Sequence, residues 1–448
     1  MDSLQFMAHQ DMVLARTENF NRCAYYLDMG LGKTFVGAEK MYLLNNEVNL
    51  VVCQKSKIDD WLQHFTDYYP DYAVFDLTQK REMEVFRDMI STERYSDYDV
   101  QIVGVINYDM VFRRKCLLHL HNFTLLLDES SLIANENTKR SRFILKMKPE
   151  SVVLLSGTPT AGKYEKLWSQ VQLLGWDITK KAFWSSYVST KWVEDGCFKR
   201  EVVTGYKNVG HLKQKLAQHG AVFMKTEEVM TLPEQVEQFI KVNRTEEYDC
   251  FIKNSYLLLD TRNLCRFEDA SDFYGTDVTP RVELVGDNSL TKTLYARQLC
   301  GQYNREKLEA FRDLLESTED RLIVFYNFNE ELDRLTKICK SLGRAVSHVN
   351  GSGKSVDAYE NMPDSVMFVQ YQAGAMGGNY QKANRVVYFT PPLSSELFEQ
   401  SKKRTHRIGQ ERTCFYYYLT CTNSIEEKIY ETLAMRRDYT DALFKKGE

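Results

Sequence analysis

The stretch FTLLLDESS, residues 123–131, decides the fold class, because an apolar run of strand length ends in two adjacent carboxylates. Similar runs, each ending in small or polar residues, surround it: LVVCQKS (50–56), VQIVGVINY (100–108) and SVVLLSGTPT (151–160). Longer stretches between them, such as TKRSRFILKM, have the spacing of amphipathic helices. This alternation predicts a parallel sheet covered by helices, with functional residues at the carboxyl ends of the strands.

The same alternation returns near the C-terminus. The runs there are RLIVFYNF (321–328), SVMFVQY (365–371), NRVVYFT (384–390) and CFYYYLT (414–420). They predict a second α/β lobe.

The middle of the chain has few such runs. Stretches such as EEYDCFIKNSYLLLDTRNL (246–264) look helical, so we expect mostly helical insertions and linker there. The predicted domains are therefore a first lobe at 1–160, helical insertions and linker at 161–302, and a second lobe at 303–448.

The composition sets broad limits on the class of protein. The chain has 448 residues, 43% of them apolar, and no run long enough to cross a membrane, so we expect a soluble, cytoplasmic protein without a membrane partner. Its ten cysteines are widely spaced and form no CxxC pair, which favours reduced core residues. The net charge is -4, so any contact with nucleic acid must come from a local basic surface.

A phosphate-binding loop is the first site that the sequence predicts. LDMGLGKTF, residues 27–35, contains Gly30, Gly32, Lys33 and Thr34. Glycines allow backbone N–H groups to turn toward phosphate oxygens, the lysine supplies a charge at the β- and γ-phosphates, and the threonine hydroxyl reaches Mg²⁺. We therefore predict that this loop binds the phosphates of a nucleotide.

The acidic pair Asp128 and Glu129 is the partner of this loop. Asp128 ends the strand and can hold Mg²⁺ through water, whereas Glu129 can orient or deprotonate the attacking water. The other interpretation, a solvated pair at a strand end, would be favoured without the upstream loop. SGTP at 156–159 follows another apolar run and taken singly predicts only a turn.

Two details qualify the phosphate loop. Leu27 stands where the first glycine of the usual pattern would be, a departure that superfamily-two motors commonly share. A second match, GSGKS at 351–355, also lacks its upstream glycine, because His348 is there, and no acidic strand end follows it at a suitable distance. We expect that segment to be a surface loop.

The order of these motifs resembles the Swi/Snf-type translocases of the helicase-like superfamily two. The resemblance runs through nearly the whole chain, and HRIGQ at 406–410 is its most specific part. Because the resemblance fills nearly the whole sequence, we expect a minimal motor of the bacterial or phage type, without an attached chromatin-reading, nuclease or zinc module. The positions that carry the resemblance outside the phosphate and acidic motifs are Trp61, Phe65, Asn107, Tyr108, Asn135, Lys139, Leu232, Pro233, Ala373, Gly374, Gly377, Asn379, Gln400, Arg404, His406, Arg407, Gly409 and Gln410.

The resemblance implies two RecA-like parallel-sheet lobes, with ATP and Mg²⁺ bound where the lobes meet. It makes Arg407 the arginine finger, Arg404 its neighbour, and Gln10 the reader of adenine. The two arginines are spaced to share one face if their segment is helical, and a solvated basic turn is the alternative. We expect Lys402 and Lys403 to contribute to DNA binding.

The sequence departs from the family pattern at two positions. Ser131 replaces the histidine of the acidic motif, which puts its usual coupling to the next motif in doubt. Leu393 replaces a tryptophan, which can alter contacts with DNA.

The resemblance implies an ATP-dependent translocase on double-stranded DNA. Closure and opening of the lobes would move the chain along the duplex through sequence-tolerant backbone contacts. One alternative is a strand-separating DNA or RNA helicase, which would share every ATPase motif. A second is a binding clamp whose ATPase has decayed.

Overall fold

The computed structural model describes residues 5–92, 101–160, 162–195, 198–260, 281–374, 378 and 380–444. The chain packs as two compact units. Unit 1 comprises Met1–Thr231 and Arg436–Glu448, and unit 2 comprises Leu232–Met435. The segment 161–302, predicted as insertions and linker, thus contributes residues to both units.

Unit 1 is built on a parallel sheet of seven strands in the order β3-β4-β2-β5-β6-β1-β9. Strands β2, β4, β5 and β6 confirm the apolar runs of the first half, and their near-continuous burial is what a sheet covered on both faces requires. The strands are β1 (Arg22–Leu27), β2 (Val48–Cys53), β3 (Tyr72–Asp76), β4 (Gln101–Asn107), β5 (Phe123–Asp128), β6 (Ser151–Leu155) and β9 (Ala221–Met224).

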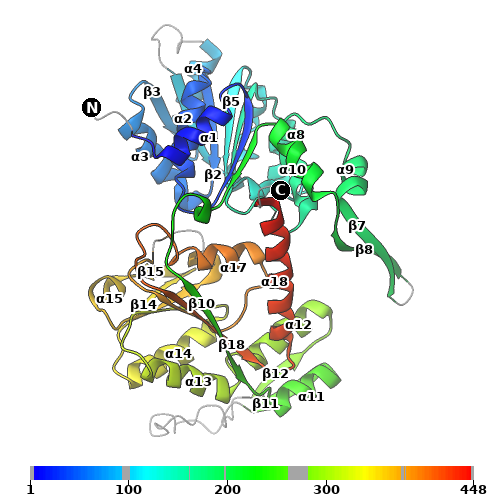
Figure 1. Cartoon of the computed structure of the whole chain (residues 1–448), viewed down its shortest axis with the longest axis vertical. Helices are drawn as coiled ribbons and strands as arrows, with labels where there is room; N and C mark the ends of the chain where they lie inside the picture. The colour runs from blue at the N-terminus through cyan, green and yellow to red at the C-terminus, as the bar shows by residue number, and fades with distance from the viewer. Residues whose placement is uncertain are drawn as a thin grey trace. The chain divides into compact units, whose positions relative to one another are not determined.

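Helices cover both faces of this sheet (Figure 1). One face packs against α1 (Ala8–Arg16), α2 (Lys33–Leu43) and α3 (Ile58–Tyr68). The other face carries α4 (Lys80–Thr92), α6 (Tyr108–Val111), α7 (Lys139–Lys146), α8 (Trp168–Leu173), α9 (Lys180–Tyr187) and α10 (Val209–Gln218).

Unit 2 has its own seven-stranded sheet, in the order β10-β18-β17-β13-β16-β14-β15. Every pair in it is parallel except β14 with β15. The apolar runs predicted in the second half are confirmed as β13, β16, β17 and β18. The strands are β10 (Gln235–Val242), β13 (Leu322–Tyr326), β14 (Val346–Asn350), β15 (Gly353–Ser355), β16 (Val366–Gln370), β17 (Arg385–Tyr388) and β18 (Cys414–Cys421).

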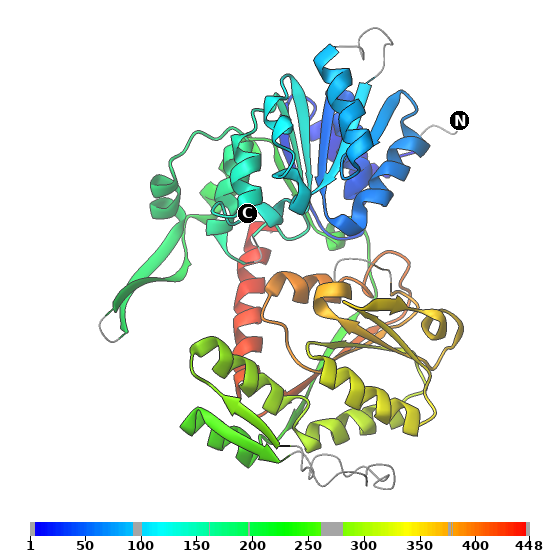
Figure 2. The ribbon, with the colours of Figure 1, turned by 180° about the vertical axis from the view of Figure 1, so that it is seen from behind.

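This second sheet is also covered on both faces, as Figure 2 shows from behind. The predicted fold class, two RecA-like α/β lobes with parallel sheets, is therefore confirmed. One face packs against α15 (Asp357–Asn361), α17 (Ser395–Lys402) and α18 (Ile425–Phe444). The other packs against α13 (Arg305–Glu316) and α14 (Asn329–Ser341), and the short helix α16 (Tyr371–Gly374) follows β16.

The middle of the chain contains strands that the sequence did not predict. Unit 1 includes a hairpin of β7 (Val188–Asp195) and β8 (Phe198–Tyr206). In unit 2, β11 (Tyr256–Asp260) pairs with β12 (Arg281–Val285) beside α11 (Glu246–Asn254) and α12 (Ser289–Cys300). No helix among the described residues is both long and apolar enough to cross a membrane.

The helical prediction for 246–264 was wrong after Asn254. The helix stops because Ser255 adopts a left-handed conformation with a φ of 57°, and YLLLD then pairs with β12 instead. Residues 261–264 lie outside the described part of the chain.

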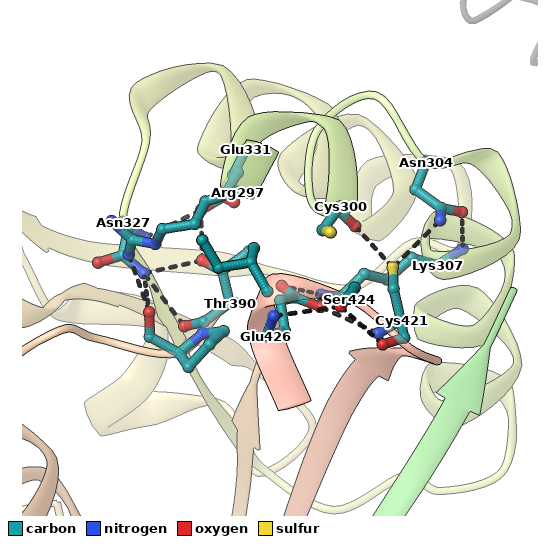
Figure 3. A network of polar contacts seen from close by, with 12 residues as sticks. Arg297, Cys300, Asn304, Lys307, Asn327, Glu331, Thr390, Cys421, Ser424 and Glu426 are labelled. Atoms are coloured by element: carbon teal, nitrogen blue, oxygen red, sulfur yellow. Dashed lines mark hydrogen bonds and ion pairs between the residues drawn. The ribbon is translucent and has the colours of Figure 1, made fainter. Parts of the chain in front are cut away.

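A buried polar network ties α12, α13 and α18 to the sheet of unit 2 (Figure 3). Lys307 donates to both carboxylate oxygens of Glu426, at 2.6 and 2.7 Å, and both side chains are fully buried. Cys300 and Cys421 lie close enough to Glu426 to form a possible metal-ligand group. Burial raises the pKa of the Cys300 thiol well above its ordinary value, which disfavours the thiolate that a metal would need. Lys307 already balances the charge of the Glu426 carboxylate. We therefore interpret this group as part of the core, stabilised by the Lys307–Glu426 ion pair.

Candidate nucleotide site

The predicted phosphate loop joins β1 to α2 in unit 1. Gly30 and Gly32 have φ angles of 92° and 72°, in the left-handed region where glycine costs least. Gly32 also leaves room for the side chain of Gln10, because a Cβ at position 32 would lie 2.1 Å from Nε2 of Gln10. Helix α2 begins directly at Lys33, so its free N–H groups and positive dipole end face the loop.

Lys33 and Gln10 both lie against this loop. Lys33 Nζ donates to the carbonyls of Leu27, at 3.0 Å, and Asp28, at 3.1 Å. Gln10 is buried on α1, and its Nε2 donates to the Leu31 carbonyl at 3.4 Å. Its Oε1 accepts from the backbone N–H of Met7 at 2.9 Å. The structure thus brings Gln10 to the loop, while its predicted role in reading adenine stays a prediction.

Asp128 lies at the end of β5, on the carboxyl edge of the sheet. Burial raises the pKa of its carboxyl group, while a hydrogen bond from Trp61 and the charge of Lys33 act in the opposite direction. Trp61 Nε1 donates to Asp128 Oδ2 at 3.0 Å. Lys33 and Asp128 are therefore close enough to influence each other electrostatically, as a shared nucleotide site requires.

Glu129 adopts a backbone conformation that is unusual for its residue type. Its φ is 56° and its ψ is 60°, in the left-handed region, and such strain is concentrated at functional sites. The hydroxyl of Tyr108 donates to the carbonyls of Asp128, at 2.9 Å, and Glu129, at 3.4 Å. Tyr108 thus helps to hold the acidic pair.

The SGTP segment after β6 completes this edge. Ser156 Oγ donates to Glu129 Oε2 at 3.3 Å. A Cβ on Gly157 would lie 3.4 Å from Lys33 Nζ, so this glycine sits against the lysine. Because β5, β6 and β1 are neighbours in the sheet, three motifs far apart in the sequence meet at one edge. SGTP is accordingly more than the turn that its sequence alone predicted.

Among the described residues of unit 1, Thr34 and Asp128 have side chains whose chemistry suits a magnesium ion. A hydroxyl at the start of α2 and a carboxylate at the end of β5 are hard oxygen donors, the type that Mg²⁺ prefers. Burial raises the pKa of the Asp128 carboxyl, and a bound cation would favour its charged form.

Arg404 and Arg407 lie in turns of unit 2 that follow α17. The segment is not helical, so the condition under which they would share a helical face is not met. Arg404 is buried and donates to the Gly378 carbonyl at 3.3 Å, and burial lowers the pKa of Arg407. The alternative of a solvated basic turn does not fit this burial.

The rest of HRIGQ anchors this turn. His406 Nε2 lies 2.7 Å from the Pro233 carbonyl, so it carries the proton, and Nδ1 accepts from the amide of Gln235 at 2.8 Å. Gln410 donates to the carbonyls of Gln381 and Ala383, both at 3.0 Å. The turn is thereby tied to the first residues of unit 2 and to the loop before β17.

The expectation that Lys402 contributes to DNA binding does not fit the structure. Its side chain is only 9% exposed, and it donates to Glu237 on β10 at 2.6 Å. Its ammonium group also lies over the rings of Phe398 and Tyr418, at 4.9 and 5.5 Å. Lys402 is therefore part of the packing of unit 2.

Other predicted positions have mixed outcomes. GSGKS at 351–355 forms a turn and the short strand β15, with no helix start at its lysine, as expected of a surface segment. Leu393 is 48% exposed. Gly377 and Asn379 lie outside the described residues.

Sequence reasoning missed the supporting contacts of the site. It assigned no task to the indole of Trp61, the hydroxyl of Tyr108 or the hydroxyl of Ser156, although each touches the acidic pair. It also passed over Gln170 on α8. For Tyr108, the signal was its place directly after strand β4, which would bring it to the carboxyl edge.

A glycine-bounded loop at a helix start, followed by a lysine and faced by an Asp-Glu pair at the same sheet edge, defines a P-loop nucleotide-binding α/β protein. The SNF2-related domain matches residues 4–300, and the Helicase conserved C-terminal domain matches residues 306–409. Because the first match covers more than half of the sequence, the chain belongs to the SNF2-related family of ATPases.

Similar proteins come from yeast and bacteria. The ISWI chromatin-remodeling complex ATPase ISW1 of Saccharomyces cerevisiae is 25% identical over 440 residues, covering 90% of this chain and 37% of its own length. The putative ATP-dependent helicase/translocase YwqA of Bacillus subtilis is 23% identical over 466 residues, covering 97% of this chain and 48% of its own. The chain thus spans less than half the length of these relatives.

A third relative and one solved structure have similarly low sequence identity to this chain. The DNA repair and recombination protein RAD26 of Saccharomyces cerevisiae is 23% identical, covering 93% of this chain and 44% of its own length. The Sulfolobus solfataricus SWI2/SNF2 ATPase core in complex with dsDNA is 20% identical, with a TM-score of 0.41 and coverage of 98% of this chain and 93% of that chain.

Proposed function

We propose that this chain is an ATP-dependent translocase that moves along double-stranded DNA and hydrolyses ATP with residues from both units. The main support is the meeting of Lys33, the Asp128–Glu129 pair and Ser156 at one sheet edge in a chain of the SNF2-related family. That arrangement has a position for the phosphates, for a metal and for the attacking water.

The roles in unit 1 follow from the chemistry of each group. Lys33 and the N–H groups at the start of α2 hold the β- and γ-phosphates. Thr34 and Asp128 would hold Mg²⁺, which neutralises charge on the phosphate oxygens. Glu129 orients the attacking water and accepts its proton, and the hydrogen bond from Ser156 fixes the direction of the carboxylate.

Unit 2 supplies the arginines. Arg407 is the proposed finger, which stabilises charge on the γ-phosphate during transfer, and Arg404 lies beside it in the same turn. Burial lowers the pKa of Arg407. A guanidinium is weakly hydrated and is therefore suited to bind a phosphate. We propose that the two units act on the same nucleotide during turnover.

We propose duplex DNA as the polymer along which the chain moves. The support is its membership of the SNF2-related family and its similarity to a chromatin-remodeling ATPase and a DNA repair protein. A net charge of -4 leaves local basic surfaces as the means of contact. Strand-separating helicases of DNA or RNA share the same ATPase groups and are the alternative that experiment must distinguish.

The first test is ATP turnover with and without duplex DNA. We expect duplex DNA to stimulate hydrolysis, and Lys33→Ala to abolish most turnover while the protein remains folded. The matched control is Lys163→Ala, which removes a half-buried lysine of unit 1 outside the proposed roles. Turnover of Lys33→Ala within about threefold of wild type, a margin of less than 1 kcal/mol in activation free energy, would contradict the assignment.

A further inference from the structure

Gln170, on α8, is a fully buried amide that the proposed chemistry does not use. Its Oε1 accepts from the hydroxyl of Ser130 at 2.8 Å and from the hydroxyl of Tyr26 at 3.0 Å. Its Nε2 donates to the carbonyl of Pro159 at 2.9 Å. One side chain therefore joins three backbone segments.

Each of these segments belongs to the nucleotide site. Tyr26 is on β1, one residue before the phosphate loop begins at Leu27. Ser130 directly follows Glu129, and Pro159 ends the SGTP segment. The carboxyl ends of β1, β5 and β6 are thus fastened to one another from the side of α8.

The hydrogen-bonding pattern determines the orientation of this amide. Two hydroxyl donors face one end and a carbonyl acceptor faces the other, so only one of the two amide orientations satisfies all three partners. An apolar side chain of similar size would fill the space but leave Tyr26, Ser130 and Pro159 without these bonds. The three hydrogen bonds of Gln170 therefore constrain the positions of its partners more closely than packing alone would.

This arrangement concerns the coupling of the acidic motif to the SGTP segment, which the serine at position 131 put in doubt. Glu129 is held on one side by Ser156, through its carboxylate, while Ser130 is held by Gln170. Because Gln170 also binds Pro159, the acidic motif and the SGTP segment are connected twice. The strained backbone of Glu129 lies between these two connections.

We propose that Gln170 is a positioning residue that couples the acidic motif to the SGTP segment and so holds the Glu129 carboxylate in its hydrolytic direction. This inference rests on the proposed function and deepens it. Gln170 is fully buried, and its amide is bonded to Tyr26, Ser130 and Pro159, so we expect it to act through the residues that it positions. Its loss should therefore reduce the rate of hydrolysis and leave nucleotide affinity nearly intact, since misplacement of a catalytic group costs rate most.

The first variant is Gln170→Leu, which preserves size and removes all three hydrogen bonds. Buried hydroxyls left without a hydrogen-bond partner destabilise the folded state, so we expect a lower melting temperature as well as a lower kcat. The expected loss in kcat is at least about tenfold, with nucleotide affinity within about twofold of wild type. Gln170→Met, which is unbranched, serves the same purpose if the leucine variant does not fold.

The second variant separates positioning from stability. In the triple variant Tyr26→Phe, Ser130→Ala, Gln170→Leu, both hydroxyls are removed together with the amide, so most of the unsatisfied polar groups are gone. We expect the melting temperature to recover and the kcat to remain low. If the kcat recovers together with the melting temperature, Gln170 has a structural role only, and the inference is overturned.

A matched control comes from the opposite edge of the same sheet. Asn46 donates from its amide to the hydroxyls of Thr124 and Ser151, at 2.9 and 3.1 Å, near the start of β5 and β6. Asn46→Leu should lower the melting temperature without changing kcat. An equal loss of kcat in Asn46→Leu would show that any such destabilisation impairs turnover and would overturn the inference.

The measurements are kcat, nucleotide affinity and melting temperature for wild type, Lys33→Ala and these variants. A wild-type chain without Lys33-dependent turnover overturns the proposed function and this inference together. Lys33-dependent turnover in wild type with unchanged kcat in Gln170→Leu overturns this inference alone.

Discussion

At the residue scale, the chemistry depends on how a few side chains at one sheet edge are held. Asp128 receives the indole N–H of Trp61, and Glu129 receives the hydroxyl of Ser156. Tyr108 binds the carbonyls of both acidic residues. These contacts fix the direction of each carboxylate before substrate arrives, which lowers the cost of organising the site during the reaction.

The different surroundings of the two carboxylates predict different phenotypes. Glu129→Gln keeps an acceptor for Ser156 but cannot take a proton, so we expect nucleotide to bind normally and to remain unhydrolysed. Glu136→Gln is the control, because Glu136 lies a few residues further on and pairs with Lys180. A loss of ATP affinity in Glu129→Gln, measured by nucleotide titration, would mean that the roles of Asp128 and Glu129 are reversed.

At the scale of elements, the turn after α17 shows how a basic run can belong to the core. Lys402 pairs with Glu237 on β10, and His406 bonds to Pro233 and Gln235 just before and at the start of that strand. The turn that carries Arg404 and Arg407 is thereby fixed to the edge of the second sheet. A change in this anchoring should therefore act on the arginines through their position.

Lys402→Ala tests this account of the turn. Loss of an ion pair and of contacts with two rings should destabilise the protein by about 2 kcal/mol or more, because the Glu237 carboxylate would lose its cationic partner, although the hydroxyl of Tyr418 also donates to it. Affinity for duplex DNA should stay within about twofold of wild type. Unchanged thermal stability together with weakened DNA binding would instead make Lys402 part of the DNA-binding surface.

A second element-scale prediction concerns Glu331 at the start of α14. Burial raises the pKa of its carboxyl group to about 7, although the N–H groups of Asn327 and Phe328 and the hydroxyl of Thr390 bind its Oε2 (Figure 3). The folded state thus holds this proton more tightly than the unfolded state, whose carboxyl has an ordinary pKa near 4.5. The stability that the folded state gains from the protonated Glu331 carboxyl is complete below pH 4.5 and is lost as the pH rises through 7.

Urea unfolding between pH 5 and pH 8 measures this contribution. Wild type should become less stable over that range by an amount that Glu331→Gln does not share, with an upper limit of about 3 kcal/mol. The glutamine variant is neutral at every pH and should show the flatter profile. Parallel profiles for the two proteins would mean that Glu331 is ionised throughout, contrary to the raised pKa.

The sequence predicted the strands and the motifs at their ends because both are local patterns. Buried parallel strands require continuous apolar runs, and FTLLLDESS or RLIVFYNF shows this directly. It could not predict the contact of Trp61 with Asp128, which depends on β2 lying beside β5. Nor could it predict that Lys402 is buried in an ion pair, because its partner Glu237 is 165 positions away in the sequence. The end of α11 at Asn254 depended on one backbone angle at Ser255, which no periodicity reveals.

At the scale of the whole molecule, the proposed reaction requires residues of both compact units. Lys33, Asp128 and Glu129 belong to unit 1, and Arg404 and Arg407 belong to unit 2. Each unit contains only part of the proposed catalytic set. Hydrolysis can therefore be linked to a change in the arrangement of the units, which is the general means by which such motors convert phosphate chemistry into movement.

Arg407→Ala tests this division of labour. Arginine fingers contribute roughly 10³ to 10⁵ in rate, so even a partly redundant pair should lose more than about tenfold of the DNA-stimulated turnover. Affinity for nucleotide and for DNA should change little. Arg412→Ala, which alters a half-exposed arginine just after the same turn, should retain turnover. Loss of DNA binding with normal basal turnover would place Arg407 on the DNA-binding surface instead.

The most direct test of the central claim is displacement of a third strand from a DNA triplex, beside separation of the strands of the same duplex. A translocase that moves along intact duplex should release the third strand in the presence of ATP, and should do so neither without ATP nor with Lys33→Ala. The two strands of the duplex should stay paired. ATP-dependent separation of the duplex would make the chain a helicase, and ATP hydrolysis without release of the third strand would contradict translocation.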